Sequence, residues 1–288
     1  MVDELTAKAE QLLAVLRSLG SVAVAFSGGI DSTVVAKGAF LALGERAIAV
    51  TADSASVPRG ELALARQVAQ EIGIRHIVLQ TDEFANPDYL KNDGSRCYYC
   101  KSELYDTIIA QLPNLAVKVV CSGANLDDLG DYRPGLQAAA ERHVRHPLQE
   151  ANFRKSDVRA LAQVWQLATW NKPASPCLSS RLAPGLAVTP ERTGKIEAAE
   201  AYLKNLGFSD CRVRLHEGEL ARLEVPLLEV PQLLQPQTQA TLVTRFREMG
   251  FRFVTIDLEG LRSGSMNDLI SLEVKSRFVR PSLERSRS

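Results

Sequence analysis

The stretch from Val22 to Ser32 constrains the fold of this chain more than any other. Its first five residues are Val, Ala and Phe, a composition typical of a strand buried on both faces of a parallel sheet. A Ser-Gly-Gly turn at 27–29 lets the backbone turn tightly, and a helix is predicted directly after it. Because the first N–H groups of a helix are unbonded and lie at the positive end of its dipole, this arrangement predicts a phosphate site. The candidate contacts are Ser27, Gly28, Gly29, Asp31 and Ser32.

Two familiar phosphate-binding patterns do not fit this turn. A Walker A loop ends in Gly-Lys-Ser/Thr, whereas Lys37 lies within the predicted helix, and a dinucleotide fingerprint needs Gly-x-Gly-x-x-Gly. The sequence Ser-Gly-Gly-Ile-Asp-Ser at 27–32 resembles the pyrophosphate loop of the ATP pyrophosphatases, the PP-loop family. That resemblance implies cleavage of ATP between its α- and β-phosphates, with the AMP half activating a carbonyl or carboxyl oxygen. An ordinary structural turn is the alternative.

Further strand–helix units follow the turn. Apolar strands are predicted at 47–53, 74–79 and 117–125, and an amphipathic helix is predicted at 61–72. Such repeats predict an α/β fold, a Rossmann-like parallel sheet with helices on both faces. The ligand of such a sheet lies at the carboxyl ends of the strands.

Acidic side chains follow two of these strands. Asp53 ends the strand at 47–53, and the turn after the strand at 117–125 carries Asp128, Asp131 and Arg133. Carboxylates and an Arg in this position suit Mg²⁺–phosphate chemistry, so these four residues are candidate ATP contacts. A solvated acidic loop is the alternative.

Three cysteines form a second candidate site. Cys97 and Cys100 make a Cys-x-x-Cys pair directly before a helix predicted at 102–111, where the helix dipole and the flanking Arg96 and Lys101 favour thiolate. Cys177 lies in an irregular loop rich in Pro and Ser, which we also expect at the ligand end. Three thiolates can hold a [4Fe–4S] cluster and leave its fourth iron open.

Other interpretations of the cysteines stay open at this point. Zinc with His143 or His146 as a fourth ligand, a redox pair at the Cys-x-x-Cys motif, and plain packing all fit the spacing. Cys121 lies within an apolar strand and is expected in the core, and Cys211 is assigned no role.

Composition excludes several classes of protein. The 288 residues are 45% hydrophobic and 24% charged with a net charge of zero, which indicates a globular protein with no nucleic-acid or membrane partner. The N-terminus predicts an amphipathic helix and no signal peptide, so we expect a cytoplasmic protein. In that reducing compartment, five cysteines indicate metal binding, catalysis or burial rather than disulfides.

The sequence pattern changes after residue 188, where a smaller α+β unit is predicted. Its expected helices and strands are 191–206, 212–216, 221–225, 238–249 and 251–258. We therefore expect a PP-loop domain at 1–185, a small C-terminal α+β domain for substrate binding or oligomerisation at 186–272, and a basic, disordered tail at 273–288.

Several motifs are more specific than the PP-loop alone. Together they resemble the LarE family, ATP-dependent sulfur transferases of the nickel-pincer nucleotide pathway that serves lactate racemase. The resemblance covers nearly the whole chain and stops before the tail. Besides 27–32, the motifs are 96–101, 130–135, 174–181 and 211–216.

The resemblance implies a reaction. The family uses ATP and Mg²⁺ to adenylylate a carboxylate of pyridinium-3,5-biscarboxylic acid mononucleotide, and a protein sulfur then displaces AMP. Some members sacrifice the sulfur of one cysteine, whereas members with three cysteines use a [4Fe–4S] cluster whose open iron holds an extra sulfide. This chain carries three such cysteines and resembles the cluster class, with sacrificial transfer from Cys177 as the alternative.

The resemblance also implies residue roles and partners. The catalytic residues would be Asp31, beside Mg²⁺, and the cluster ligands Cys97, Cys100 and Cys177, with Lys101 at the nucleotide. Arg181, Arg212 and Arg214 are candidates for the substrate's phosphate and carboxylates, because the guanidinium fork matches both groups. The implied partners are a small-molecule nucleotide substrate, a sulfur-donating system and further copies of the chain in a homo-hexamer.

Three other functions compete with this interpretation. A tRNA thiolation enzyme can share the loop and the Cys-x-x-Cys pair, but it should show a basic surface or an added RNA-binding domain. An amide-forming synthetase for NAD or GMP would need no set of cysteines. A regulatory module would hold ATP without turnover.

Overall fold

We describe a computed structural model of the chain over residues 2–129, 133–262, 264–270 and 275. The described chain forms two compact units. The first contains residues up to Glu83 together with Cys97–Ser175, and the second contains Phe84–Arg96 and the chain from Pro176 to Lys275. Among the described residues, none of the helices combines the length and the apolar character needed to cross a membrane.

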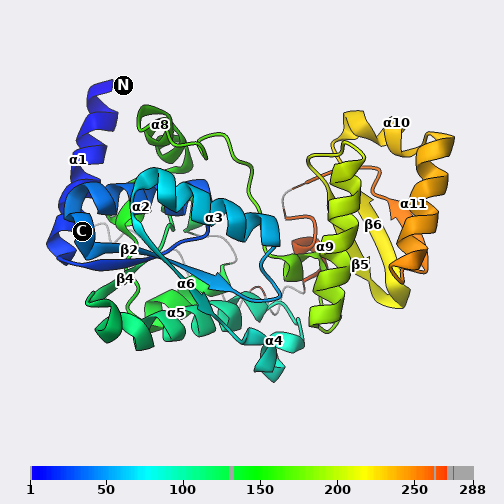
Figure 1. Ribbon diagram of the computed structural model, residues 1–288, viewed down its shortest axis with the longest axis horizontal. Helices are drawn as coiled ribbons and strands as arrows, with labels where there is room; N and C mark the ends of the chain where they lie inside the picture. The colour runs from blue at the N-terminus through cyan, green and yellow to red at the C-terminus, as the bar shows by residue number, and fades with distance from the viewer. Residues whose placement is uncertain (1, 130–132, 263, 271–274, 276–288) are drawn as a thin grey trace, which may run out of the picture. The chain divides into compact units, whose positions relative to one another are not determined.

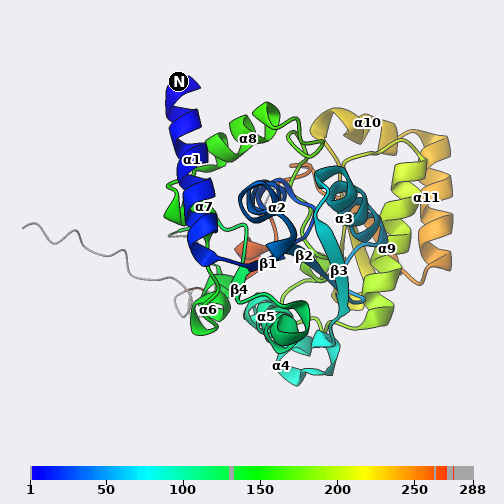
Figure 2. The ribbon, with the colours of Figure 1, turned by 60° about the vertical axis from the view of Figure 1, so that its left-hand side comes forward.

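The first unit is built on a parallel sheet of four strands, in the order β3-β2-β1-β4 (Figure 2). The strands are β1 (Val22–Ala25), β2 (Ala47–Asp53), β3 (Arg75–Gln80) and β4 (Val119–Cys121). In the central strand, Val24 pairs with Ala49 of β2 on one side and with Cys121 of β4 on the other. The prediction of a parallel-sheet α/β fold is therefore confirmed.

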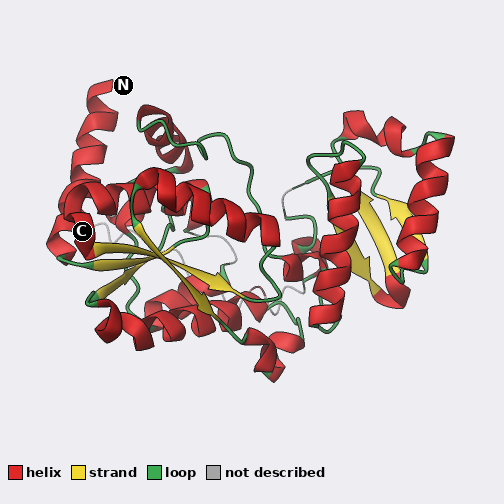
Figure 3. Ribbon diagram, viewed as in Figure 1, coloured by secondary structure: helices red, strands yellow, loops and turns green. Residues whose placement is uncertain are grey.

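Helices cover both faces of this sheet (Figures 1 and 3). Successive β1 side chains point to opposite faces, so Val22 and Val24 pack in one apolar cluster and Ala23 packs in the other. The first cluster includes residues of α1 (Val2–Leu19), α2 (Ile30–Leu43), α3 (Arg59–Ile72), α7 (Pro147–Glu150) and α8 (Lys155–Val164). The second includes residues of α5 (Arg96–Leu115) and α6 (Pro134–Glu141).

The start of α5 differs from the expected one. The helix was expected from residue 102, but it begins at Arg96, so Cys97, Cys100 and Lys101 lie inside its first turns. The segment 96–101 carries Cys and Tyr, which are weak helix formers, and packing of the helix overrides that local preference. The short helices α4 (Pro87–Leu90), α6 and α7 were not predicted, since each begins at a proline in a segment without helical periodicity.

The second unit contains a three-stranded sheet in the order β5-β6-β7, with β5 and β6 antiparallel and β6 and β7 parallel. This confirms the prediction of a smaller α+β part. Its elements are α9 (Pro190–Asn205), β5 (Arg212–His216), β6 (Leu220–Glu224), α10 (Val230–Leu233), α11 (Pro236–Glu248) and β7 (Phe253–Ile256). The 3₁₀ helices of the chain are Gly44–Arg46, Glu83–Ala85, Leu126–Asp128, Leu178–Arg181, Glu217–Glu219, Leu227–Glu229 and Asn267–Leu269.

The antiparallel pair in this sheet has one apolar face and one charged face. Val213 lies opposite Leu223 on the apolar face, whereas Arg214 and Glu224 lie on the other. Arg214 donates to Glu224 Oε2 from Nε at 2.9 Å and from Nη2 at 2.7 Å, and the Glu224 side chain is 0% exposed. A charge buried to this degree requires its counter-charge.

The two units do not divide the chain at residue 185. The segment 84–96 joins the second unit because Asn92 Nδ2 donates to Ala183 O at 2.9 Å, and because Val188 N donates to Leu90 O at 2.9 Å. The domains predicted from the sequence, 1–185 and 186–272, remain a prediction. Apart from Lys275, the predicted tail at 273–288 lies outside the described residues.

A substitution of Glu224 tests whether the buried ion pair with Arg214 stabilises the second unit. Glu224→Gln removes the buried counter-charge of Arg214, and breaking a buried ion pair from one side costs about 3–5 kcal/mol. We expect a loss of about 3 kcal/mol in the free energy of urea unfolding. The control is Glu248→Gln, which breaks an exposed pair with Arg245 and should cost less than about 1 kcal/mol. Equal losses in the two variants would contradict the assignment.

Candidate active site

The loop between β1 and α2 has the geometry expected of an anion site. Gly28 has a φ of +68°, and a Cβ added there would lie 3.0 Å from the Cα of Ala65 in α3. Gly29 is the N-cap of α2, and as a glycine it has no side chain to cap the helix. The backbone N–H groups at the start of α2 therefore lie at a turn that only glycine can form at position 28.

Two serines hold the loop in shape. Ser32 Oγ donates to Gly29 O at 3.0 Å and accepts from Ser27 N at 3.3 Å. The hydroxyls of Ser27 and Ser32 lie 3.2 Å apart. The contacts of 3.2–3.3 Å are long for hydrogen bonds to hydroxyl groups, so a phosphate oxygen can replace them at small cost.

Gly123, just after β4, packs against the start of α2. A Cβ at this position would lie 2.7 Å from Ser32 N and 2.9 Å from the carbonyl carbon of Asp31. A side chain cannot occupy that space unless the helix or the strand moves. The loops after β1 and β4 are thus in direct contact, as expected for adjacent strands at the ligand end of an α/β sheet.

Acidic residues lie at this edge of the sheet, among them Asp31 and Asp128, which were expected near Mg²⁺ and the phosphates. Asp31 accepts from Asn125 Nδ2 at 3.0 Å and from Lys155 Nζ. Asp127 accepts from the backbone N–H of Lys155 at 2.8 Å. Asp128 pairs with Arg133 at 3.1 Å, whereas Asp131 lies outside the described residues.

Asp31 can serve as a ligand for a magnesium ion that arrives with phosphates. Mg²⁺ is commonly held by one or two carboxylates together with substrate oxygens rather than by a protein cage. Within the described chain, no three His, Cys, Asp or Glu side chains come close enough to hold a metal ion by themselves. The carboxylate of Asp31 therefore fits Mg²⁺ only when the ion arrives bound to the phosphates of a nucleotide. Lys155 would then move away from Asp31.

Sequence reasoning missed a second lysine at the loop. Lys172 Nζ donates to Gly28 O at 3.3 Å and to the carboxylate of Glu61, in the first turn of α3. Its side chain is only 14% exposed. The one sequence feature that could have indicated Lys172 is its position in the irregular loop that leads to Cys177 and that was expected at the ligand end.

Asp53 lies at the carboxyl end of β2, as expected. It accepts from Arg59 Nη1 at 2.6 Å and from Gln80 Nε2 at 3.0 Å. Burial favours the protonated carboxyl, but these hydrogen bonds outweigh it and hold the pKa of Asp53 below its usual value. Asp53 is therefore ionised at neutral pH.

Cys97 and Cys100 lie three residues apart in the first turns of α5 and so share one side of the helix. Cys97 is exposed and Cys100 is half-buried. The start of α6 contacts this turn, because a Cβ on Gly135 would lie 2.9 Å from Lys101 Cγ. The Arg-Pro-Gly motif at 133–135 therefore belongs beside the Cys-x-x-Cys motif in the first unit.

Cys177 precedes a 3₁₀ turn in the second unit, and Arg181 shapes that turn. Arg181 is 1% exposed, and its Nη1 donates to Cys177 O at 2.9 Å while its Nε donates to Glu200 at 3.0 Å. Arg96 donates to Ser179 O at 2.6 Å in the same unit. The structure thus gives Arg181 a positioning role for the Cys177 turn, and its direct contact with substrate stays a prediction.

The other two predicted arginines lie at β5. Arg214 is buried against Glu224, whereas Arg212 is half-buried and donates to Cys211 O at 2.7 Å. Burial, aided by the nearby charge of Arg181, lowers the pKa of Arg212. An additional anion at Arg212 would relieve this crowding of positive charge.

The remaining cysteines, Cys121 and Cys211, are buried. Burial raises the pKa of the Cys121 and Cys211 thiols to about 12. A thiol with that pKa is protonated at neutral pH and is a poor nucleophile. The expectation that Cys121 lies in the core is confirmed, since its exposed fraction is 0%.

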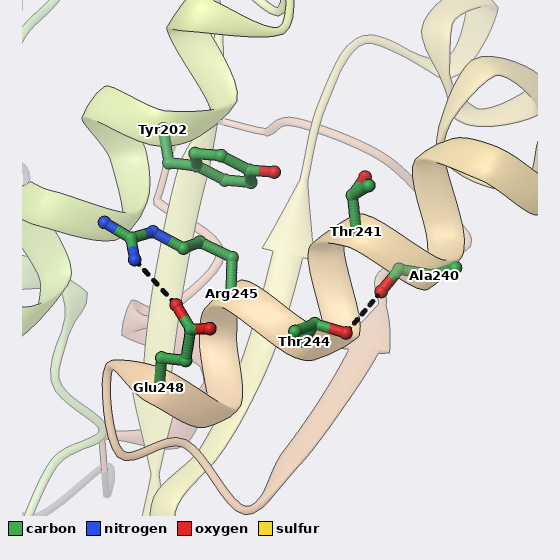
Figure 4. Close-up of a pocket in the computed structure, with 6 residues that line it drawn as sticks. All are labelled: Tyr202, Ala240, Thr241, Thr244, Arg245 and Glu248. Atoms are coloured by element: carbon green, nitrogen blue, oxygen red, sulfur yellow. Dashed lines mark hydrogen bonds and ion pairs between the residues drawn. The ribbon is translucent and has the colours of Figure 1, made fainter.

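A hollow of about 350 Å³ lies on the second unit, between α9 and α11 (Figure 4). Tyr202, Arg245 and Glu248 line it, and Arg245 pairs with Glu248 at 2.6 Å. The residues that line it include none of the predicted site residues. We assign it no part in the site.

Comparison with known proteins decides the family. Residues 9–124 match the asparagine synthase family. The chain is 40% identical over 277 residues to the pyridinium-3,5-bisthiocarboxylic acid mononucleotide synthase of Lactiplantibacillus plantarum, over 96% of this chain and 99% of that protein. The chain belongs to the LarE family. It is also 45% identical over 267 residues to an uncharacterised protein of Synechocystis sp., over 93% of this chain and 99% of that protein.

Membership of the LarE family confirms the resemblance inferred from the motifs, and with the PP-loop match it makes the chain an ATP-dependent enzyme. The asparagine synthase match covers β1, the glycine-rich loop and β4, the elements that form the anion site. The roles of individual residues rest on geometry and chemistry alone.

Gly123 tests the contact between the loops of this LarE-family site. Gly123→Ala would place a methyl group 2.7 Å from Ser32 N and displace the start of α2. Overpacking of this kind costs about 1–3 kcal/mol, so we expect ATP binding measured by calorimetry to weaken by about tenfold or more. Gly60→Ala, with nothing within 4 Å of the added carbon, is the control and should bind ATP normally. Normal binding by both variants would contradict the argument.

Thiol labelling tests the division of the cysteines. After treatment with a chelator, iodoacetamide at pH 8 should modify Cys97, Cys100 and Cys177, because alkylation needs an accessible thiolate. Cys121 and Cys211 should react only in denaturant. Peptide mass spectrometry gives the order of reaction, and early labelling of Cys211 in folded protein would contradict the prediction.

Proposed function

We propose that this enzyme converts the carboxylates of pyridinium-3,5-biscarboxylic acid mononucleotide to thiocarboxylates with ATP. One observation carries the proposal: a pyrophosphate loop, with Asp31 and Lys155 at its edge, occurs in a chain that matches a synthase of the bisthiocarboxylic acid along almost its full length. This reaction belongs to nickel-pincer nucleotide biosynthesis, the pathway that the motifs imply.

Adenylylation is the first step. A substrate carboxylate oxygen attacks the α-phosphorus of ATP, the bond from that phosphorus to the bridging oxygen breaks, and pyrophosphate leaves. The N–H groups of Gly28 and Gly29, the hydroxyls of Ser27 and Ser32, and the start of α2 bind the departing charge. A carboxylate is a poor electrophile, and the acyl-adenylate makes it a good one because AMP is a good leaving group.

Positive charge near the loop assists this step. Lys155 is held at Asp31, where it can meet phosphate oxygens, and Mg²⁺ bound with ATP would neutralise charge on the phosphates. We place Asp53, Lys101, Asp128, Asp131 and Arg133 around the nucleotide. Arg212, supported by Arg181 and Arg214, is placed at the substrate's phosphate or carboxylate.

Sulfur transfer is the second step. A sulfur nucleophile attacks the acyl carbon, the carbon–oxygen bond to AMP breaks, and the thiocarboxylate is released. We place Cys97, Cys100 and Cys177 as ligands of a [4Fe–4S] cluster, which when bound would supply the sulfur. Their support is chemical: Cys97, Cys100 and Cys177 are exposed or half-buried, whereas Cys121 and Cys211 are buried.

Further features remain part of the proposal. A cytoplasmic location, a sulfur-donating system and a homo-hexamer follow from the sequence and the family resemblance. A client such as lactate racemase would use the finished cofactor. Sacrificial transfer from Cys177 is the alternative source of sulfur.

Iron and acid-labile sulfide content of protein purified without oxygen tests the sulfur source. We expect about four irons per chain and a broad absorption band near 400 nm, roughly as for other [4Fe–4S] centres. Cys97→Ala, Cys100→Ala and Cys177→Ala should each lose the iron, whereas the control Cys211→Ala should keep it. Product formation from ATP and the biscarboxylate, followed by mass spectrometry, should show oxygen replaced by sulfur over several turnovers.

Two outcomes would contradict parts of the proposal. Colourless protein after attempted cluster reconstitution, with one turnover per chain and loss of sulfur from Cys177, would replace the cluster by the sacrificial mechanism. Absence of AMP and pyrophosphate with the biscarboxylate would contradict the substrate assignment.

A further inference from the structure

Lys172 holds a positive charge against the pyrophosphate loop, and the family motifs that led to the site did not include a role for it. Its ammonium group contacts the Gly28 carbonyl at 3.3 Å and the carboxylate of Glu61. We propose that Lys172 binds the β- and γ-phosphates of ATP and the pyrophosphate product, and that Glu61 is the partner that those phosphates displace. The proposal rests on ATP use by the family and not on the source of sulfur.

The location of Lys172 suits a phosphate ligand. Gly28 is the central residue of the turn, and its carbonyl accepts from the Lys172 ammonium group, which therefore lies against the loop that is the candidate phosphate site. The Lys172 and Glu61 side chains are 14% and 25% exposed, so their charges are only partly screened by water. An incoming phosphate therefore interacts strongly with this ammonium group.

The charges explain why an exchange is favourable. An ammonium group has three N–H donors, and the contacts with Gly28 and Glu61 account for two of them. Pyrophosphate carries several negative charges, whereas Glu61 carries one. Near the loop, the product anion therefore competes successfully for Lys172, and Glu61 keeps the lysine in place when no nucleotide is bound.

A purely structural ion pair makes a different prediction. If Lys172 and Glu61 only tie the loop to α3, loss of either side chain should disturb the loop in the same direction. If they exchange partners, the two losses act oppositely, because Lys172 is the ligand and Glu61 is its competitor. The direction of the two effects separates the alternatives.

The experiment measures binding of magnesium pyrophosphate and of AMP to the full-length protein by calorimetry, without the carboxylate substrate. Lys172→Gln should weaken pyrophosphate binding by about tenfold or more and leave AMP binding within about twofold, since AMP lacks the β- and γ-phosphates. Glu61→Gln should tighten pyrophosphate binding by roughly threefold. The control is Lys8→Gln, which breaks a 2.8 Å pair with Asp157 in the same unit and should change neither affinity.

The proposal is overturned if both variants weaken pyrophosphate binding, or if Lys172→Gln weakens AMP and pyrophosphate equally. Where Lys172→Gln does not fold, Glu61→Gln and Lys172→Arg decide the question, because arginine keeps the charge and should keep at least a third of the affinity, roughly. These titrations involve neither the cysteines nor the carboxylate. Failure here leaves the proposed sulfur transfer standing, and failure of the iron assay leaves this result unaffected.

Discussion

The close backbone contacts around the start of α2 are the constraint on which the active site depends. Gly28 fits against Ala65 of α3, and Gly123 fits against the backbone of Asp31 and Ser32. These contacts fix the glycine turn between β1, α3 and the loop after β4. The N–H groups of the turn are consequently preorganised before any phosphate binds, so little of the binding energy is lost in ordering the loop.

Charges near this turn are held in partly exposed ion pairs. Lys155 lies on Asp31 and Lys172 lies on Glu61, and all four side chains are partly exposed. In the second unit the pairs of Arg181 with Glu200 and of Arg214 with Glu224 are almost fully buried. Partly exposed pairs can open to a phosphate at modest cost, whereas buried pairs hold the backbone and leave Arg212 as the more accessible arginine.

The sequence alone was enough to propose the candidate site residues that depend on local chemistry. Ser27–Ser32 needed only the strand–turn–helix pattern, and Cys97 and Cys100 needed only their spacing. Lys155 and Lys172 were not recognised because their partners lie 124 and 111 residues away in the chain. The burial of Arg181 could not be predicted either, because nothing in the sequence of its loop indicates an ion pair with a glutamate of α9.

By itself the sequence determined the parallel α/β fold, the glycine turn between β1 and α2, the α+β character of the second unit and the family. These properties follow from apolar periodicity, from glycines at a required turn and from motifs, all of which are local. Tertiary structure alone decided that segment 84–96 belongs to the second unit, that α5 begins at Arg96, and that two lysines pair with acids at the loop. The physical reason is that hydrogen bonds and ion pairs between distant segments form only when the sheet and its helices bring those segments together.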